Sequence, residues 1–188
     1  MTPRPRFAIG TTAFGPFGVV WNERGIVRTW LHARTDGAAR AAILRAFPYG
    51  QPAAPAPAIA DAIDGVACLL DGEPVDLTWV ELDMGNIAVF DRRVYEVSRA
   101  IPPGSTMTYG AIAAVLGEEP MRARDVGQAL AGNPFAPIVP CHRVVGARGR
   151  LGGYSAPGGA STKRRLLELE GAEIVATNLR QPGLFDLT

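Results

Sequence analysis

The sequence predicts a small α/β domain over residues 1–85, in which helices accompany a small sheet, followed by a mainly α-helical domain with a helix-turn-helix over residues 86–188. Three observations indicate this arrangement: alternating apolar segments near the start, helical periodicity after Phe90, and an ordinary composition. The 188 residues carry 19 Lys and Arg against 18 Asp and Glu, and 47% are hydrophobic. This composition excludes a fully disordered chain, and the length suffices for a hydrophobic core.

In the first half, turn residues separate short apolar runs. Residues 18–21 and 26–31 flank a polar turn and predict a β-hairpin. Helical composition follows over residues 37–47. A loop rich in Pro and Ala over residues 48–57 then leads into a second predicted helix, residues 58–70.

Both cysteines, Cys68 and Cys141, are expected to be free thiols. The first residues lack the apolar segment of a secretory signal, and no apolar run approaches the roughly 20 residues of a membrane span. We therefore expect a cytoplasmic protein without membrane association, in a reducing compartment. Apolar neighbours predict that Cys68 is a buried structural thiol. His32 is interpreted as a surface histidine, and this half lacks the further Cys and His residues of a zinc site.

Helical signals dominate the second half. An apolar stripe beginning at Phe90 predicts a helix that Pro102 ends. Thr108 is the predicted N-cap of a helix over residues 109–116. After a short turn, residues 122–131 predict another helix. This pair is typical of a helix-turn-helix, although ordinary helical bundles contain the same pattern.

The second helix of this pair is rich in small residues, among them Gly127, Ala129 and Ala131. Small residues let a helix backbone approach a nucleic-acid groove closely, and they serve tight helix packing equally well. The charge is also uneven: between Arg122 and Arg165 lie eight basic residues and one acid, Asp125, a local charge of +7. Such a cluster is typical of a nucleic-acid-binding surface. A solvated basic face is the alternative.

Cys141 and His142 stand together in a Pro-bounded segment near several arginines. They form a candidate activated nucleophile, because nearby cationic groups increase the thiolate fraction of a thiol whose ordinary pKa is about 8.5. A buried structural thiol beside a surface histidine is the alternative.

The last predicted helix, residues 161–170, ends at Gly171 and directs Glu170 inward beside two leucines. A buried carboxylate needs a partner. His142 is the natural candidate, which would give a Cys–His–Glu relay in which the carboxylate orients the imidazole. Pairing of Glu170 with Arg164 or Arg165 at the surface is the alternative.

The sequence Pro-Cys-His-Arg-Val at residues 140–144 resembles the signature of the O6-alkylguanine-DNA alkyltransferases, also called methylated-DNA–protein-cysteine methyltransferases. The similarity covers about residues 90–171, whereas the first half resembles the variable first domain of the family only loosely. Further matches follow in the family's order: Thr108-Tyr109-Gly110, Ala123-Arg124, Val126-Gly127, Asn133-Pro134, Gly152-Gly153-Tyr154-Ser155, Lys163, Leu166-Leu167 and Glu170.

The resemblance implies direct repair of double-stranded DNA that contains O6-alkylguanine. Cys141 would take the alkyl group from a flipped guanine in an irreversible, single-turnover displacement. His142, held by Glu170, would deprotonate the thiol through a water, and Tyr109 would donate a proton to the departing guanine. Arg124 would fill the space that the base leaves.

The same resemblance assigns the remaining site residues and partners. The residues that it assigns to substrate binding are Val144, Tyr154, Ser155 and Asn133. Asn133 would also fix the turn after the second helix. DNA contacts fall to Arg124, Ala123, Gly127 and Gln128. The resemblance further implies a winged-helix-like second domain, no metal or organic cofactor, and a monomer associated with the nucleoid when bound to DNA. O4-alkylthymine is a further candidate substrate.

Two departures from the family pattern and three rival functions accompany this interpretation. Asp125 beside Arg124 is expected to weaken DNA binding modestly, and Ala156-Pro157 extends the pocket loop, which bears on bulky alkyl groups. The rivals are a damage sensor without a nucleophile, which Cys141 argues against, a turnover hydrolase, and an alkylation-sensing DNA-binding regulator with little repair turnover.

Overall fold

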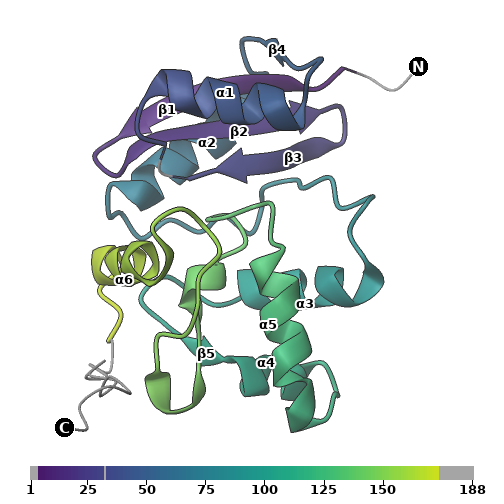
Figure 1. Ribbon diagram of the computed structural model, residues 1–188, viewed down its shortest axis with the longest axis vertical. Helices are drawn as coiled ribbons and strands as arrows, with labels where there is room; N and C mark the ends of the chain where they lie inside the picture. Colours follow the sequence, from purple (N-terminus) through teal and green to yellow (C-terminus); the bar gives the residue numbers. More distant parts are fainter. Residues whose placement is uncertain (1–3, 32, 174–188) are drawn as a thin grey trace, which may run out of the picture.

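A four-stranded sheet forms one layer of the molecule, above a helical layer (Figure 1). The computed structural model describes residues 4–31 and 33–173, so the interpretation of His32 lies outside the described residues. The sheet order is β3-β2-β1-β4. Its strands are β1 (Arg6–Thr12), β2 (Gly15–Asn22), β3 (Gly25–Trp30) and β4 (Gln51–Pro52).

The predicted hairpin is confirmed, because β2 and β3 pair antiparallel around the expected turn. The predicted loop at residues 48–57 differs from expectation, since its residues Gln51 and Pro52 pair parallel with β1. This strand is only two residues long, and proline has no N–H to donate to a ladder. Its pairing depends on the position of β1 rather than on a local sequence signal.

Two helices cover opposite faces of the sheet. On one face, α1 (Asp36–Ala46) packs Ile43 against Phe7 and Val20. On the other, α2 (Pro57–Leu70) belongs to the main core cluster with Val19. Alternate residues of β2 therefore face different helices, as the period of two in a strand requires. Both predicted helices of the first half are confirmed.

The second layer is helical, as predicted (Figure 1). The N-cap of α4 is also as predicted, because the Thr108 hydroxyl accepts a hydrogen bond from the Ala111 N–H at 3.1 Å. A parallel two-stranded pair, β5 with β6, joins the start of α4 to the segment after Cys141. The elements are α3 (Val89–Arg99), β5 (Met107–Thr108), α4 (Tyr109–Val115), η1 (Pro120–Arg122), α5 (Ala123–Ala131), η2 (Cys141–Arg143), β6 (Val144–Val145), η3 (Ala147–Gly149) and α6 (Gly159–Leu169).

The core is continuous between the two layers. Buried side chains of the sheet and α2 belong to one cluster with buried side chains of α3, α4 and α5. At the edge of the sheet, Thr29 of β3 donates from its N–H to the Pro134 carbonyl at 2.8 Å and from its hydroxyl to the Ala136 carbonyl at 2.5 Å. The first half therefore supports the segment that precedes Cys141. The domain boundary at residue 85 stays a prediction.

Cys68 departs from expectation, because its side chain on α2 is only half-buried and borders polar as well as apolar groups. Its position near the C-terminal end of α2 explains the difference, since the acidic residues Asp71 and Glu73 follow the helix. Both cysteines are free thiols.

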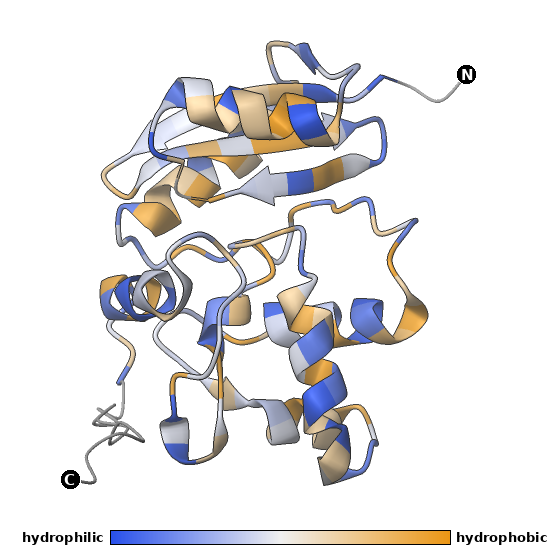
Figure 2. Ribbon diagram, in the orientation of Figure 1, coloured by the Kyte–Doolittle hydropathy of each residue, from blue (hydrophilic) through white to orange (hydrophobic). Residues whose placement is uncertain are grey.

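Across residues 4–31 and 33–173, the helices are too short or too polar to span a lipid bilayer. Helix α5, for example, carries both hydrophilic and hydrophobic residues along its length (Figure 2).

Candidate active site

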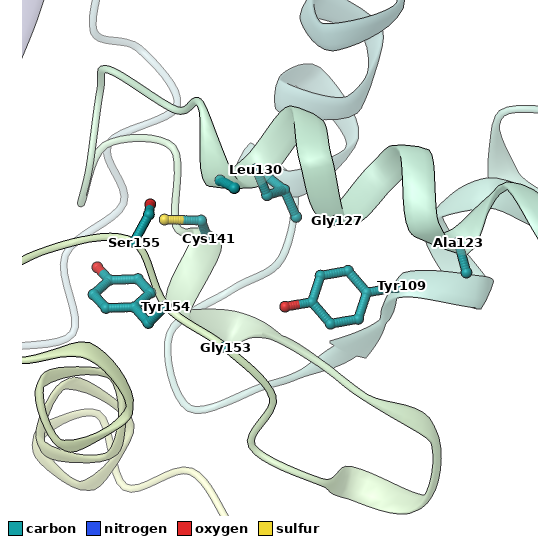
Figure 3. Close-up of a pocket in the computed structure, with 9 residues that line it drawn as sticks. Tyr109, Ala123, Gly127, Leu130, Cys141, Gly153, Tyr154 and Ser155 are labelled. Atoms are coloured by element: carbon teal, nitrogen blue, oxygen red, sulfur yellow. The ribbon is translucent and has the colours of Figure 1, made fainter.

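The thiol of Cys141 lies at the wall of a pocket of about 490 Å³ between α4, α5 and the loop that carries Tyr154 (Figure 3). This volume falls within the range of about 300–1,000 Å³ typical of small-molecule sites. Cys141 is 6% exposed. The pocket is lined by Tyr109, Ala123, Gly127, Leu130, Ala131, Cys141, Gly153, Tyr154 and Ser155.

A turn held by Asn133 places Cys141 at this wall. The Asn133 side-chain amide donates to the Val139 carbonyl at 2.8 Å, and its side-chain oxygen accepts from the Phe135 N–H at 2.9 Å. The Cys141 N–H in turn donates to the same Val139 carbonyl, also at 2.8 Å. The Asn133 side chain therefore holds the turn between α5 and the segment that carries Cys141, which is the role that the family resemblance implied for it.

Behind Cys141, the buried carboxylate of Glu170 accepts hydrogen bonds from two side chains, those of His142 and Arg143. His142 Nε2 lies 2.8 Å from Glu170 Oε1, and both side chains are almost fully buried. The predicted contact of these two residues is therefore present. Among the described residues, the alternative pairing of Glu170 with Arg164 or Arg165 is not present. The arginine that pairs with Glu170 is Arg143, which donates hydrogen bonds of 2.8 Å from Nη2 and 3.0 Å from Nε.

The charge of Glu170 determines which ring nitrogen of His142 carries the proton. Burial raises the pKa of Glu170, but hydrogen bonds from His142 and Arg143 outweigh burial and lower that pKa to about 2. An ionised carboxylate only accepts hydrogen bonds, so the proton of a neutral His142 sits on Nε2. Its Nδ1 then carries the free lone pair. This atom is buried and has no hydrogen-bond partner among the described residues.

Burial determines the acidity of both the thiol and the imidazole. It raises the pKa of Cys141, and the nearby polar side chains of Asn133 and Tyr154 and the charge of Lys163 offset only part of this effect. The cation Lys163 does lower the pKa of the thiol, as expected, but burial outweighs its effect. Burial also lowers the pKa of His142, despite Glu170. The Cys141 thiol therefore keeps its proton and needs a base to become a nucleophile, and the neutral His142 imidazole is able to act as that base.

Lys163 is a functional candidate to which the sequence interpretation gave no role beyond the basic cluster and a match to the family pattern. It is fully buried on α6, and its Nζ donates to the Val144 carbonyl at 2.5 Å. Its Nζ also lies 3.5 Å from the Tyr109 hydroxyl. Burial lowers the pKa of Lys163 to about 8. The signal was available, because Lys163 precedes the buried Leu166 and Leu167 by three and four residues on one helix face.

Tyr109 enters the pocket from the start of α4 (Figure 3). Burial, with a smaller contribution from the Cys141 thiolate, raises the pKa of Tyr109. Burial and the same thiolate also raise the pKa of Tyr154 well above its usual range. Both phenols therefore keep their protons at neutral pH and remain hydrogen-bond donors to a bound molecule.

The outer helix α5 presents two different surfaces. Ala123 and Gly127 face the pocket, whereas Arg124 and Gln128 are exposed. A Cβ atom at Gly127 would meet its nearest neighbours, in the Tyr109 ring, at 3.9 Å, an ordinary contact distance. Packing within the described chain therefore does not require glycine at this position.

The charges around Arg124 are arranged so that its own side chain stays available. Among the described residues, no ion pair involves Arg124. The neighbouring Asp125 is held instead by a short ion pair with Arg122, which also bonds Glu118 at 3.4 Å. The acidic group expected to oppose DNA phosphates thus has a cationic partner of its own.

The predicted site residues fall into three groups around Cys141. Tyr109, Tyr154, Ser155, Ala123 and Gly127 line the pocket with it. His142 and Glu170 lie behind it, Asn133 holds the turn before it, and Val144 follows it in β6, while Arg124 and Gln128 lie outside on α5. Within the part of the chain that the structure describes, no group of three or more His, Cys, Asp or Glu side chains is placed to hold a metal ion.

A buried thiol with a histidine–carboxylate pair behind it and a pocket in front defines a cysteine nucleophile site. Residues 89–172 match the family model described as "6-O-methylguanine DNA methyltransferase, DNA binding domain". A methylated-DNA–protein-cysteine methyltransferase of Methanothermobacter thermautotrophicus is 38% identical over 157 residues, covering 84% of this chain and 80% of that protein. The chain belongs to the methylated-DNA–protein-cysteine methyltransferase family.

Solved structures agree with this assignment. The crystal structure of Mycobacterium tuberculosis OGT in complex with DNA is similar with a TM-score of 0.67 and 34% identity, covering 88% of this chain and 92% of that one. The crystal structure of Mycobacterium tuberculosis O6-methylguanine methyltransferase gives a TM-score of 0.68 at 34% identity, covering 92% and 96%.

Proposed function

We propose that this chain repairs double-stranded DNA by moving the alkyl group of O6-alkylguanine to Cys141, once per molecule. The observation that carries the proposal is the placement of the Cys141 thiol between an open pocket of about 490 Å³ and the buried His142–Glu170 pair. The thiol has a base on one side and room for a purine on the other. The family assignment supplies the substrate class.

The proposed reaction begins with loss of the thiol proton. His142 Nδ1 accepts it through a water, and Glu170 stabilises the imidazolium that forms. The thiolate then attacks the alkyl carbon; the S–C bond forms while the C–O6 bond breaks, and its electron pair stays on the guanine. Tyr109 donates a proton to the departing base. A thioether is a poor leaving group, so the step does not reverse and the protein is consumed.

The pocket walls give the flipped guanine its contacts. The carbonyls of Cys141 and Val144 accept from its amino group, and Lys163 holds the Val144 carbonyl in place. Tyr154 and the Ser155 N–H lie near O6, where they favour the charge that develops on this atom. The turn of Asn133 keeps the sulfur at this wall.

On the DNA side, α4 and α5 act as a helix-turn-helix within a winged-helix-like domain over residues 86–188. Small residues Ala123 and Gly127 let α5 approach the minor groove, and Gln128 contacts the duplex beside them. Arg124 inserts into the stack where the base has left. Extrusion of a base costs a few kcal/mol, and the inserted side chain and occupied pocket offset this cost.

One chain contains the pocket, the nucleophile and the DNA-facing helix, which supports action as a monomer. The proposed partner is double-stranded DNA with O6-alkylguanine, and O4-alkylthymine is a further substrate of the same kind. The proposed location is the cytoplasm, with association with the nucleoid on DNA. No step of this reaction calls for a metal or organic cofactor.

A titration of lesion against protein tests the proposal. Duplex DNA with one O6-methylguanine is incubated with increasing amounts of protein, and the remaining lesion is counted after the reaction stops. We expect the repaired lesion to equal the active protein, mole for mole. Repair of many lesions per molecule would indicate a turnover hydrolase, and lesion binding without repair would indicate a damage sensor.

A further inference from the structure

A second cavity, of about 240 Å³, also borders Cys141. It shares Ala131, Cys141, Tyr154 and Ser155 with the first pocket. Its other walls come from the turn before Cys141, the loop after Ser155, and the edge strand β3, which lies nearest the helical layer (Figure 1). These walls are Arg28, Thr29, Trp30, Leu31, Gly132, Asn133, Ala136, Ala156 and Pro157.

The geometry of the proposed displacement gives this cavity a use. Attack requires the sulfur, the reacting carbon and O6 to lie close to one line. The guanine takes up the first pocket, on the O6 side of that line. Any group attached to the reacting carbon must project sideways from the line, so an alkyl group longer than methyl needs space beside Cys141. The cavity toward β3 provides it.

The charge in this cavity is positive. Arg28 is the one charged residue among the described residues of its lining. The guanidinium lies over the Trp30 ring at 5.0 Å from the ring centroid, and among the described residues no ion pair involves it. Arg28 is exposed, so its cation stands at the mouth of the cavity rather than inside it.

A carboxylate on the alkyl group would meet an unfavourable charge at the nucleophile. Attack by the Cys141 thiolate brings two anions close together, and like charges within a few ångströms repel. The Arg28 guanidinium at the mouth of the cavity offsets this repulsion and offers a planar donor pair to a carboxylate. A neutral alkyl group gains nothing from the same cation.

We propose that Arg28, stacked on Trp30 at the edge of β3, is a specificity residue that favours transfer of alkyl groups ending in a carboxylate, such as carboxymethyl. The proposal rests on the proposed function of Cys141. In the transfer, the thiolate forms a bond to the methylene carbon, the C–O6 bond breaks with its electrons on guanine, and Tyr109 supplies the proton. The product is S-carboxymethylcysteine and unmodified guanine.

Single-turnover rates on two matched duplexes test the inference, one with O6-methylguanine and one with O6-carboxymethylguanine, each at saturating protein. Replacement Arg28→Gln should lower the carboxymethyl rate by about three- to five-fold, the size typical of a partly exposed ion pair, and leave the methyl rate unchanged. Arg28→Lys should keep most of the carboxymethyl rate. Arg45→Gln, the same change at an exposed site in the last turn of α1, is the control and should affect neither substrate.

The outcomes separate this inference from the proposed function. If Arg28→Gln slows both substrates equally, Arg28 binds the DNA backbone and the specificity role is wrong. An unchanged carboxymethyl rate in Arg28→Gln would overturn it as well. If the unaltered protein fails to take a methyl group at all, the proposed function fails, and the inference fails with it.

Discussion

Replacement of Glu170 by Gln tests whether the buried carboxylate holds the base of the site in place. The amide keeps the size of the side chain but removes the charge that faces Arg143 and His142 at 2.8 Å each. Arg143 would then be a buried cation without its charged partner, although its Nη1 still donates to the backbone carbonyl of Ile101. Removal of one partner of a buried ion pair costs about 3–5 kcal/mol.

For a chain of this size, each kcal/mol lowers the melting temperature by about 2–4 °C. We therefore expect Glu170→Gln to melt about 10–15 °C below the unaltered protein at pH 7. Thermal unfolding followed by circular dichroism measures the difference. Glu168→Gln is the matched control, because Glu168 is an exposed residue of the same helix and should melt within about 2 °C of the unaltered protein.

The pH dependence gives this prediction its sharper form. The folded protein holds the pKa of Glu170 at about 2, below its ordinary value. A lowered carboxyl pKa stabilises the fold above the unfolded pKa, and this stabilisation is lost as pH falls through the folded pKa. The difference in melting temperature between the unaltered protein and Glu170→Gln should therefore stay constant from pH 7 to about 5 and decrease from there toward pH 2. The reasoning would be refuted by a difference in melting temperature below 3 °C at pH 7, or by a difference at pH 3 that is as large as the one at pH 7.

Three further predictions concern the transfer itself. Arg124→Ala should slow repair of duplex DNA more than reaction with the free alkylated base, because intercalation matters only in the duplex; equal losses on both substrates would remove that role. Tyr109→Phe should lower the single-turnover rate by about 100-fold, as expected for loss of a proton donor, with lesion affinity by gel shift nearly unchanged; a normal rate would assign proton donation to another group. Because burial lowers the pKa of His142, the transfer rate should fall on acidification only below about pH 6.5, the ordinary histidine value; a fall that begins above pH 7 would mean that His142 is not the base.

Local patterns in the sequence predicted most of the secondary structure. The helices α1 to α6 and the β2–β3 hairpin depend on periodicity, caps and turn residues, which act within a few residues of one another. The strand β4 and the β5–β6 pair were not predicted. Two-residue strands carry no periodicity, and each exists because tertiary packing brings it beside a partner.

The site was predictable where residue chemistry and spacing coincide, and less so where it depends on burial. The inward direction of Glu170 followed from its helix face, and the choice of His142 followed from the scarcity of histidine. Arg143 and Lys163 looked like members of a basic surface, yet both are buried. The net acidity of Cys141 could not be predicted for the same reason: Lys163 lowers the pKa of the thiol, but the larger effect of desolvation depends on the complete packing around the sulfur.

The most direct test of the central claim is the mass of the protein after reaction with duplex DNA that contains O6-methylguanine. We predict that each molecule gains the mass of one methyl group in place of a hydrogen, and that peptide mapping places this group on the fragment carrying Cys141. The Cys141→Ala variant should gain no mass and still bind the lesion. Loss of the lesion with an unmodified Cys141, or a methyl group on any other residue, would contradict the account.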